Sequence, residues 1–143
     1  MGTYITVVGK DHYLVLNSLW AVLKEGVFQP DKLILLQWDD KDCSGLYKQI
    51  KELLNAYEIE VSIEHTSRRD GIVSEDEETA LDISGGDMES TARLLIDNEI
   101  SGLKHIFLLK IEGSFGSKIP YPLIDSSKLH LLDILDDEVK TIG

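Results

Sequence analysis

The chain has 143 residues, of which 43% are apolar and 28% are charged, and its formal net charge is −12. This composition can bury a hydrophobic core and excludes an intrinsically disordered protein. The length is typical of one domain, so we expect residues 1–143 to form a single compact unit. The acidic balance argues against general binding of long nucleic acid, which requires basic surface to displace counterions.

Membrane and metal signals are lacking in the sequence. No apolar run reaches the roughly 18–20 residues that a membrane-spanning helix requires, so we expect no membrane segment in this chain. Cys43 is the only cysteine, which excludes an intrachain disulfide and favours a reducing, cytoplasmic environment. The scattered histidines have no zinc-ligand spacing, so we expect no metal and no cofactor.

Strand-like and helical patterns alternate from the N-terminus. Tyr4–Val8 is short, apolar and rich in β-branched residues, which predicts a strand that ends at Gly9. A helical stripe that stops at Gly26 follows, and it consists of Leu16, Leu19, Trp20 and Leu23. Lys32–Leu36 predicts a second buried strand. A second helical stripe, with Ser44 as its candidate N-cap, consists of Leu46, Ile50, Leu53, Leu54 and Tyr57.

The alternation continues through the second half of the chain. Glu60–Ile63 predicts a third strand, and Thr79–Ile83 a fourth. A third helix follows the fourth strand, with a predicted stripe of Met88, Thr91, Ala92 and Leu95. His105–Leu109 predicts a fifth strand, and Leu131–Leu135 predicts a short final helix.

Strands that alternate with helices predict an α/β fold of Rossmann-like type, with a mainly parallel central sheet and helices on both faces. In such sheets, ligands bind beyond the carboxyl ends of the strands, where the strand order reverses. This rule indicates the loops after the first and fourth strands, Gly9–Tyr13 and Ser84–Met88.

Asp82–Met88 leaves a buried strand and opens a helix. Gly85 and Gly86 let the backbone approach a ligand closely, and a helix N-terminus offers N–H groups with partial positive charge. Ser84 adds a hydroxyl donor. The segment therefore predicts a site for a phosphate-bearing nucleotide. The alternative is a tight structural turn in which Asp87 is the N-cap of the helix.

The loop after the first strand offers charged side chains to the same site. Lys10 can neutralise a phosphate, and His12 can donate to one or act as a general acid or base. The alternative is a solvated loop in which Asp11 caps the first helix. Trp38, which follows the second strand, is a candidate for stacking on a base or for burial in the core or an interface.

Three features of the chain together are similar to one known family. The first strand ends in Gly9 and a polar loop, and Leu81–Gly86 is similar to a family segment of the form Asp-hydrophobic-Thr/Ser-Gly-Gly-Thr-Lys. Ile106–Leu109 is followed by a Gly/Pro-rich excursion and the predicted Leu-rich helix. Over essentially its whole length, the chain resembles the CARF family, the CRISPR-associated Rossmann-fold sensor domains.

The resemblance implies a single CARF domain over residues 1–143 that acts as a homodimer. The expected ligand is a cyclic oligoadenylate, with cyclic tetra-adenylate the leading candidate. Type III CRISPR complexes make this second messenger during antiviral defence. Ser84, Gly85 and Gly86 match the ligand-contacting segment of the family. The first ligand loop of the family corresponds to Gly9, Lys10, Asp11 and His12.

The chain departs from the family at the end of the glycine-rich segment. Asp87 and Met88 stand where the family often has Thr-Lys, so a lysine is lost and a carboxylate is gained beside the expected phosphates. Both residues remain in the candidate ligand-binding set. We expect Asp87 to cap the helix or to bind a ribose or adenine.

Two alternative functions follow from the same residues. Some CARF dimers are ring nucleases, which cleave the messenger without metal. For that activity, the candidate catalytic residues of this chain are Lys10, His12 and Ser84. The second alternative is a nucleotide-binding α/β protein unrelated to CRISPR, or an acidic interaction module without a ligand.

Overall fold

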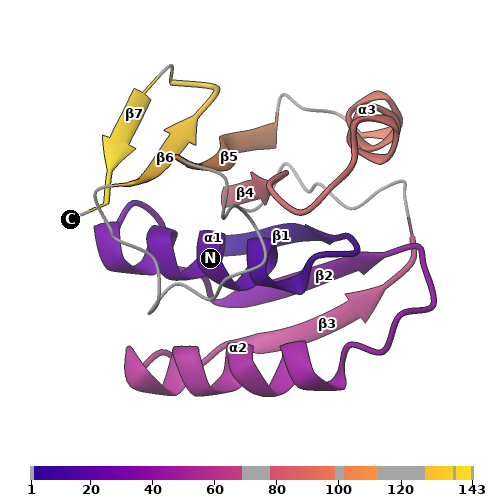
Figure 1. Ribbon diagram of the computed structural model, residues 1–143, viewed down its shortest axis with the longest axis horizontal. Helices are drawn as coiled ribbons and strands as arrows, with labels where there is room; N and C mark the ends of the chain where they lie inside the picture. The colour runs from indigo at the N-terminus through magenta and orange to yellow at the C-terminus, as the bar shows by residue number, and fades with distance from the viewer. Residues whose placement is uncertain (1, 69–77, 99–101, 113–127, 137, 143) are drawn as a thin grey trace.

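The computed structural model describes residues 2–68, 78–98, 102–112, 128–136 and 138–142. Within these residues, one seven-stranded sheet has the order β3-β2-β1-β4-β5-β6-β7 (Figure 1). The strands are β1 (Gly2–Val8), β2 (Lys32–Gln37), β3 (Ser62–Thr66), β4 (Glu78–Asp82), β5 (Leu103–Ile111), β6 (Leu129–Asp133) and β7 (Glu138–Thr141). The helices are α1 (His12–Glu25), α2 (Ser44–Ala56) and α3 (Met88–Asp97).

The centre of the sheet is parallel and fully buried. Every residue of β1 is buried, and β1 pairs in parallel with β2 and β4, so that Tyr4 lies opposite both Leu33 and Ala80. The pairs β2–β3 and β4–β5 are also parallel. Strands buried on both faces consist of continuous apolar runs, which is how they were identified in the sequence. The Rossmann-like α/β class is therefore confirmed.

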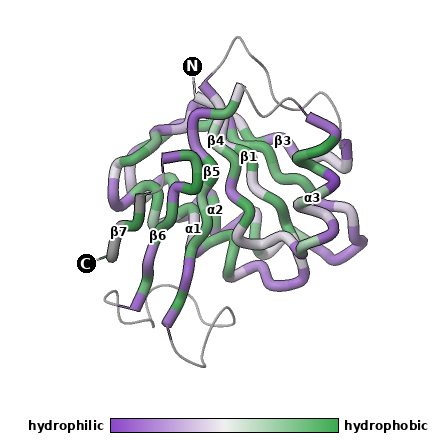
Figure 2. Tube along the Cα trace, turned by 90° about the horizontal axis from the view of Figure 1, so that it is seen from above, coloured by the Kyte–Doolittle hydropathy of each residue, from purple (hydrophilic) through white to green (hydrophobic). Residues whose placement is uncertain are grey.

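Helices cover both faces of the sheet, as predicted. Leu19 of α1 and Ile50 of α2 belong to one buried apolar cluster, and Leu94 of α3 belongs to another with Ile5 and Ile34. Figure 2 shows α1 and α2 on one side of β1 and α3 on the other, with the tube mostly green along the central strands. In the part of the chain that the structure describes, no helix is both long and apolar enough to cross a bilayer.

Local signals in the sequence place most helix ends. Asp11 caps α1, and its carboxylate accepts a hydrogen bond from the Tyr13 N–H at 3.0 Å. Gly26 ends α1 in the left-handed conformation, with φ of 64°, where a side chain would be strained. The cap predicted at Ser44 is one residue too late, because α2 begins at Ser44 itself and Asp42 accepts from its N–H at 2.9 Å.

The predicted stripe of α3 is wrong, because it leaves out the residue that the helix buries. Leu94 is the buried residue, whereas Met88 is 89% exposed and Ala92 is exposed as well. Thr91 and Leu95 flank Leu94 and are half-buried. A helix that packs one short face against a sheet buries only a narrow stripe. Adjacent residues point in different directions around a helix, so Leu94 and Leu95 cannot both lie at the centre of that stripe.

The predicted final helix at Leu131–Leu135 is also wrong. Leu129–Asp133 is β6, which pairs antiparallel to β5 with Leu131 opposite Leu109. Burial alternates along this strand: Leu129 and Leu131 enter the core, whereas His130 and Leu132 are half-buried. The third strand also lies slightly later than predicted, at Ser62–Thr66. The Gly/Pro-rich excursion at 113–127 lies outside the described residues.

The strand assignment of the tail has a direct test. In a helix, Leu131 and Leu135 would share one face, whereas in the structure Leu131 is 2% exposed and Leu135 is 44% exposed. Leu131→Ala should therefore lower the free energy of unfolding by about 2–5 kcal/mol. Leu135→Ala should change it by about 0.5 kcal/mol or less. Equal losses for the two variants in urea denaturation would contradict the strand.

Candidate ligand-binding site

The strand order reverses between β1 and β4, because β2 and β3 lie on one side of β1 and β4 and β5 on the other. The turns that follow β1 and β4 therefore meet at the carboxyl edge of the sheet. A Cβ atom on Gly9 would lie 2.0 Å from the Gly85 carbonyl oxygen, and one on Gly85 would lie 2.5 Å from the Val7 carbonyl oxygen. Only residues without a side chain permit this contact.

A cleft of about 500 Å³ opens over the two turns, and we call it the glycine cleft. Its volume lies within the range of small-molecule sites. It is lined by Val7, Val8, Gly9, Lys10, Trp38, Asp39, Gly85, Gly86, Asp87 and Ser90. The predicted loops thus form one continuous surface with the residues that follow β2.

A second, wider depression of about 980 Å³ adjoins the glycine cleft, and we call it the lysine pocket. Lys10 lines both cavities. The residues around the lysine pocket are Lys10, Asp11, His12, Tyr13, Lys41, Gly45, Leu46, Lys48, Gln49 and Glu52. Three lysines gather here in a chain whose net charge is −12. Two carboxylates, Asp11 and Glu52, also line this pocket, so the lysines leave it only a small excess of positive charge beside the glycine cleft.

The glycine cleft itself carries more negative than positive charge. Its charged lining residues are Lys10, Asp39 and Asp87. The Asp87 carboxylate caps α3 and accepts from the Ser90 N–H at 2.7 Å, and this hydrogen bonding lowers its pKa. A hydrogen bond from the Gln37 amide lowers the pKa of Asp39 in the same way. Both carboxylates are ionised at neutral pH, so they favour hydroxyl and amino donors over phosphates.

His12 faces the lysine pocket as a neutral imidazole. Burial, followed by the charge of Lys41, lowers its pKa, so it is a proton acceptor rather than a donor at neutral pH. Its Nε2 lies 3.9 Å from the Cys43 sulfur, whose thiol donates to the Gln37 Oε1 at 2.9 Å. Burial, followed by Asp39, raises the pKa of Cys43, so the thiol stays protonated and is a poor nucleophile.

A buried carboxylate supports the turn after β4. Asp82 is fully buried and accepts hydrogen bonds from the Thr6 hydroxyl at 2.8 Å, the Ser18 hydroxyl at 2.5 Å and the Ser84 N–H at 3.0 Å. The Ser84 oxygen in turn accepts from the Leu109 N–H at 2.8 Å. Ser84 thus joins its turn to β5 and does not line the cleft. Its contact with a ligand stays a prediction.

The structure brings most of the predicted site residues together. Five of them line the glycine cleft: Gly9, Lys10, Gly85, Gly86 and Asp87. Asp11 and His12 line the lysine pocket. Ser84 lies behind the cleft, and Met88 lines neither cavity.

Sequence reasoning missed Lys41 and Lys48, which complete the lysine pocket. The switch-point rule pointed only to the loops after β1 and β4, whereas Lys41 follows β2, the other neighbour of β1. Extending the rule to that loop would have found Lys41. Lys48 lies within α2, so no local signal marked it.

Comparisons with known proteins identify the fold. No protein-family model matches the chain, and no curated protein matches it. One solved structure is described as a type III CRISPR defence DNA nuclease activated by cyclic oligoadenylate; it matches with a TM-score of 0.63 at 15% sequence identity. The match covers 99% of this chain and 21% of the nuclease chain, so this chain spans only a minor part of that protein.

The contact between the two glycine turns predicts that the cost of a Gly→Ala substitution depends strongly on its position. Gly9→Ala would place a methyl group against the Gly85 carbonyl, and it should lower the free energy of unfolding by about 1–3 kcal/mol. Gly45 is the matched control, because an added Cβ there meets nothing within 4 Å. Gly45→Ala in α2 should be neutral or stabilising by up to about 1 kcal/mol. Equal effects of the two variants in urea denaturation would refute the close approach.

Burial of Asp82 predicts a pH dependence of stability. Burial raises its pKa above the ordinary 3.8, so the folded state binds this proton more tightly than the unfolded chain. The resulting stabilisation is complete below about pH 4 and is lost as pH rises through the folded pKa. Asp82→Asn cannot titrate. Between pH 4 and 7, the free energy of unfolding of the native protein should therefore fall relative to that of the variant. A difference that stays constant with pH would show that burial does not shift this group.

Proposed function

We propose that this chain is a CARF-type sensor domain that binds cyclic tetra-adenylate in type III CRISPR antiviral signalling. The observation that carries the proposal is the packing of two glycine turns at the switch point, beneath a cleft of about 500 Å³. Leu81–Gly86 runs from the end of β4 into one of these turns and resembles the ligand-contacting segment of the family. The similar fold of a nuclease activated by cyclic oligoadenylate also supports the proposal.

The distribution of charge suggests how the ring lies. Lys10 stands at the boundary of the two cavities, and Lys41 and Lys48 extend the positive surface into the lysine pocket. We assign the phosphates to this side, where three lysines outnumber two carboxylates, whereas the glycine cleft has two carboxylates and one lysine. Asp39 and Asp87, in the glycine cleft, accept hydrogen bonds from ribose hydroxyls or the adenine amino group.

Trp38 offers an aromatic face to the same ligand. It lines the glycine cleft, and its indole N–H donates to the Ser67 carbonyl oxygen at 3.0 Å, which fixes the ring. Stacking of a base on an aromatic side chain typically contributes about 1–3 kcal/mol. In this proposal an adenine stacks on Trp38. A compact ring also loses less conformational entropy than a linear strand, while the acidic surface repels a long polyanion.

A homodimer would present two glycine clefts to one symmetric ring. Met88 is 89% exposed and Ile96 is 80% exposed on α3, the helix that begins at the glycine cleft. Large apolar side chains at such exposure are suited to an interface between subunits. We therefore place α3 at the dimer interface, with residues 1–143 as one CARF domain in each subunit.

Cleavage of the ring is the second candidate function, and the position of His12 favours it. Neutral His12 shares the lysine pocket with Lys10, so it can accept the proton of a ribose 2′-hydroxyl while lysine stabilises the developing charge. His12 is less suited to protonate the leaving 5′-oxygen, because burial lowers its pKa. Ser84 is engaged by the Leu109 N–H, so its catalytic role rests on the family resemblance alone.

Calorimetric titration tests the proposal. Cyclic tetra-adenylate should bind with one ring per two chains, and linear tetra-adenylate should bind more weakly. Lys10→Ala should weaken binding by about tenfold or more, because a hydrogen bond to a charged group contributes roughly 1.5–3 kcal/mol. Lys104→Ala is the control, since Lys104 is an exposed lysine of β5 that lines neither cavity. Absence of binding to the ring, or equal effects of the two lysine variants, would contradict the proposal.

The same samples distinguish a sensor from a ring nuclease. After hours with excess EDTA, ligand recovered intact would support a sensor. Multiple turnovers to linear fragments that end in a 2′,3′-cyclic phosphate, lost in Lys10→Ala/His12→Ala, would establish ring cleavage. Preference for an ordinary mononucleotide over the ring would instead indicate an unrelated nucleotide-binding protein.

A further inference from the structure

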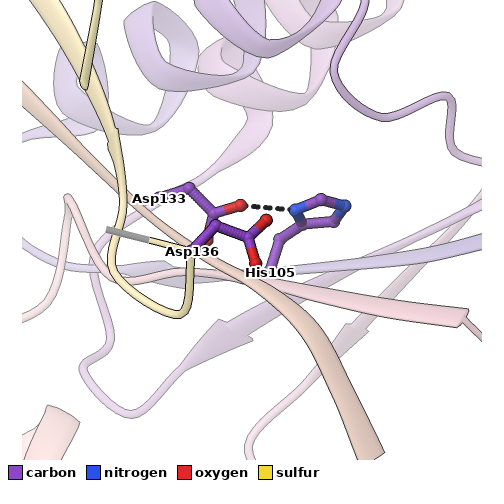
Figure 3. Close-up of side chains that lie close together, drawn as sticks. All are labelled: His105, Asp133 and Asp136. Carbon is purple, nitrogen blue, oxygen red and sulfur yellow. Dashed lines mark hydrogen bonds and ion pairs between the residues drawn. The ribbon is translucent and has the colours of Figure 1, made fainter. Parts of the chain in front are cut away.

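A second cluster of polar side chains lies at the opposite edge of the sheet from the glycine cleft. His105 is near the start of β5, Asp133 ends β6, and Asp136 lies in the turn that follows (Figure 3). One donor atom from each residue lies within 4.8 Å of the other two. The cluster has no part in the proposed ligand site, because none of its members lines either cavity.

Two of these three donors are held in place by their surroundings. The His105 ring stacks on Phe107, with centroids 5.1 Å apart, and meets Phe28 edge to face at 5.8 Å. Asp133 is buried; one of its oxygens lies 2.6 Å from the His105 Nδ1, and the other accepts from the Ile106 N–H at 3.3 Å. Such fixed orientation is typical of groups that bind a ligand without a large entropic cost.

The charges of the cluster are unbalanced without a cation. Two carboxylates, Asp133 and Asp136, lie close together as like charges beside a single imidazole. A divalent ion neutralises both carboxylates. An ordinary ion pair accounts for the contact between His105 and Asp133, but it does not account for the approach of Asp136. The net charge of −12 further favours uptake of a cation.

We propose that His105, Asp133 and Asp136 form a binding site for a divalent transition-metal ion, with zinc as the best-suited ion. One imidazole and two carboxylates match the nitrogen and oxygen ligands that zinc accepts, whereas magnesium prefers oxygen ligands alone. The ion replaces the hydrogen bond between the His105 Nδ1 and the Asp133 carboxylate. These two groups therefore move apart, and the exposed Asp136 carboxylate moves toward the ion. Water completes the coordination.

The bound ion would connect β5 to the turn between β6 and β7. Sequence spacing did not reveal this site, because His105 and Asp133 are 28 residues apart and meet only through the antiparallel pairing of β5 with β6.

Calorimetric titration of EDTA-treated, dialysed protein with zinc chloride tests the proposal, together with NMR spectra of the His105 imidazole. We expect one zinc ion per chain at this site, a shifted His105 signal, and no comparable effect of magnesium chloride. Asp136→Asn should weaken zinc binding by at least about tenfold, a loss of the size seen when groups that support a metal site are removed. Asp40→Asn, at another exposed aspartate, should have no effect.

Three results would overturn the site: an unshifted His105 signal at saturating zinc, equal zinc affinity of Asp136→Asn and the native protein, or equal losses in Asp136→Asn and Asp40→Asn. Asp136 is exposed, so its substitution should leave the fold intact, which circular dichroism verifies. The outcome is independent of the proposed function, because the zinc site shares no residue with either cavity proposed for cyclic tetra-adenylate.

Discussion

The contact between the turns after β1 and β4 forms the floor of the glycine cleft. A methyl group on Gly9 would lie 2.0 Å from the Gly85 carbonyl oxygen, so two backbones occupy space that side chains would otherwise fill. The turns meet because the strand order reverses between β1 and β4. Beneath them, the hydroxyls of Thr6 and Ser18 hold the buried Asp82 carboxylate, so β1, α1 and β4 are joined at the base of the cleft. The glycine cleft therefore has a rigid floor and walls made of side chains.

The two cavities differ in charge: carboxylates outnumber lysines in the glycine cleft, and lysines outnumber carboxylates in the lysine pocket. Met88 stands where the resembling family often has lysine, so the glycine cleft lacks that cation, and Asp87, one position earlier, uses its carboxylate to cap α3 through the Ser90 N–H. Positive charge comes instead from Lys10 and Lys41, on the other side of the first loop. This shift moves the expected phosphates away from the glycine turn and leaves the turn for sugar and base.

Features set by residues close in sequence could be predicted, and features set by distant contacts could not. Asp11 and Asp87 cap the N-termini of α1 and α3, and Gly26 ends α1. Each acts through a hydrogen bond or backbone angle within three residues, so the local sequence was sufficient to predict these helix ends. Leu131 lies in a leucine-rich run that fits both helical and strand periods, and pairing with β5 decides between them. The Ser84 hydroxyl bonds to the Leu109 N–H, 25 residues away, which no local pattern reveals.

Backbone NMR during titration with cyclic tetra-adenylate tests the central claim, that the two glycine turns form the ligand site, most directly. Each amide reports its own environment, so the spectra locate the ligand without any substitution. The account predicts that the largest shifts occur at Gly9, Lys10, Gly85 and Gly86, with smaller ones at Lys41 and little change along β6. Saturable shifts confined to residues outside the two cavities, or no shifts at millimolar ligand, would contradict it.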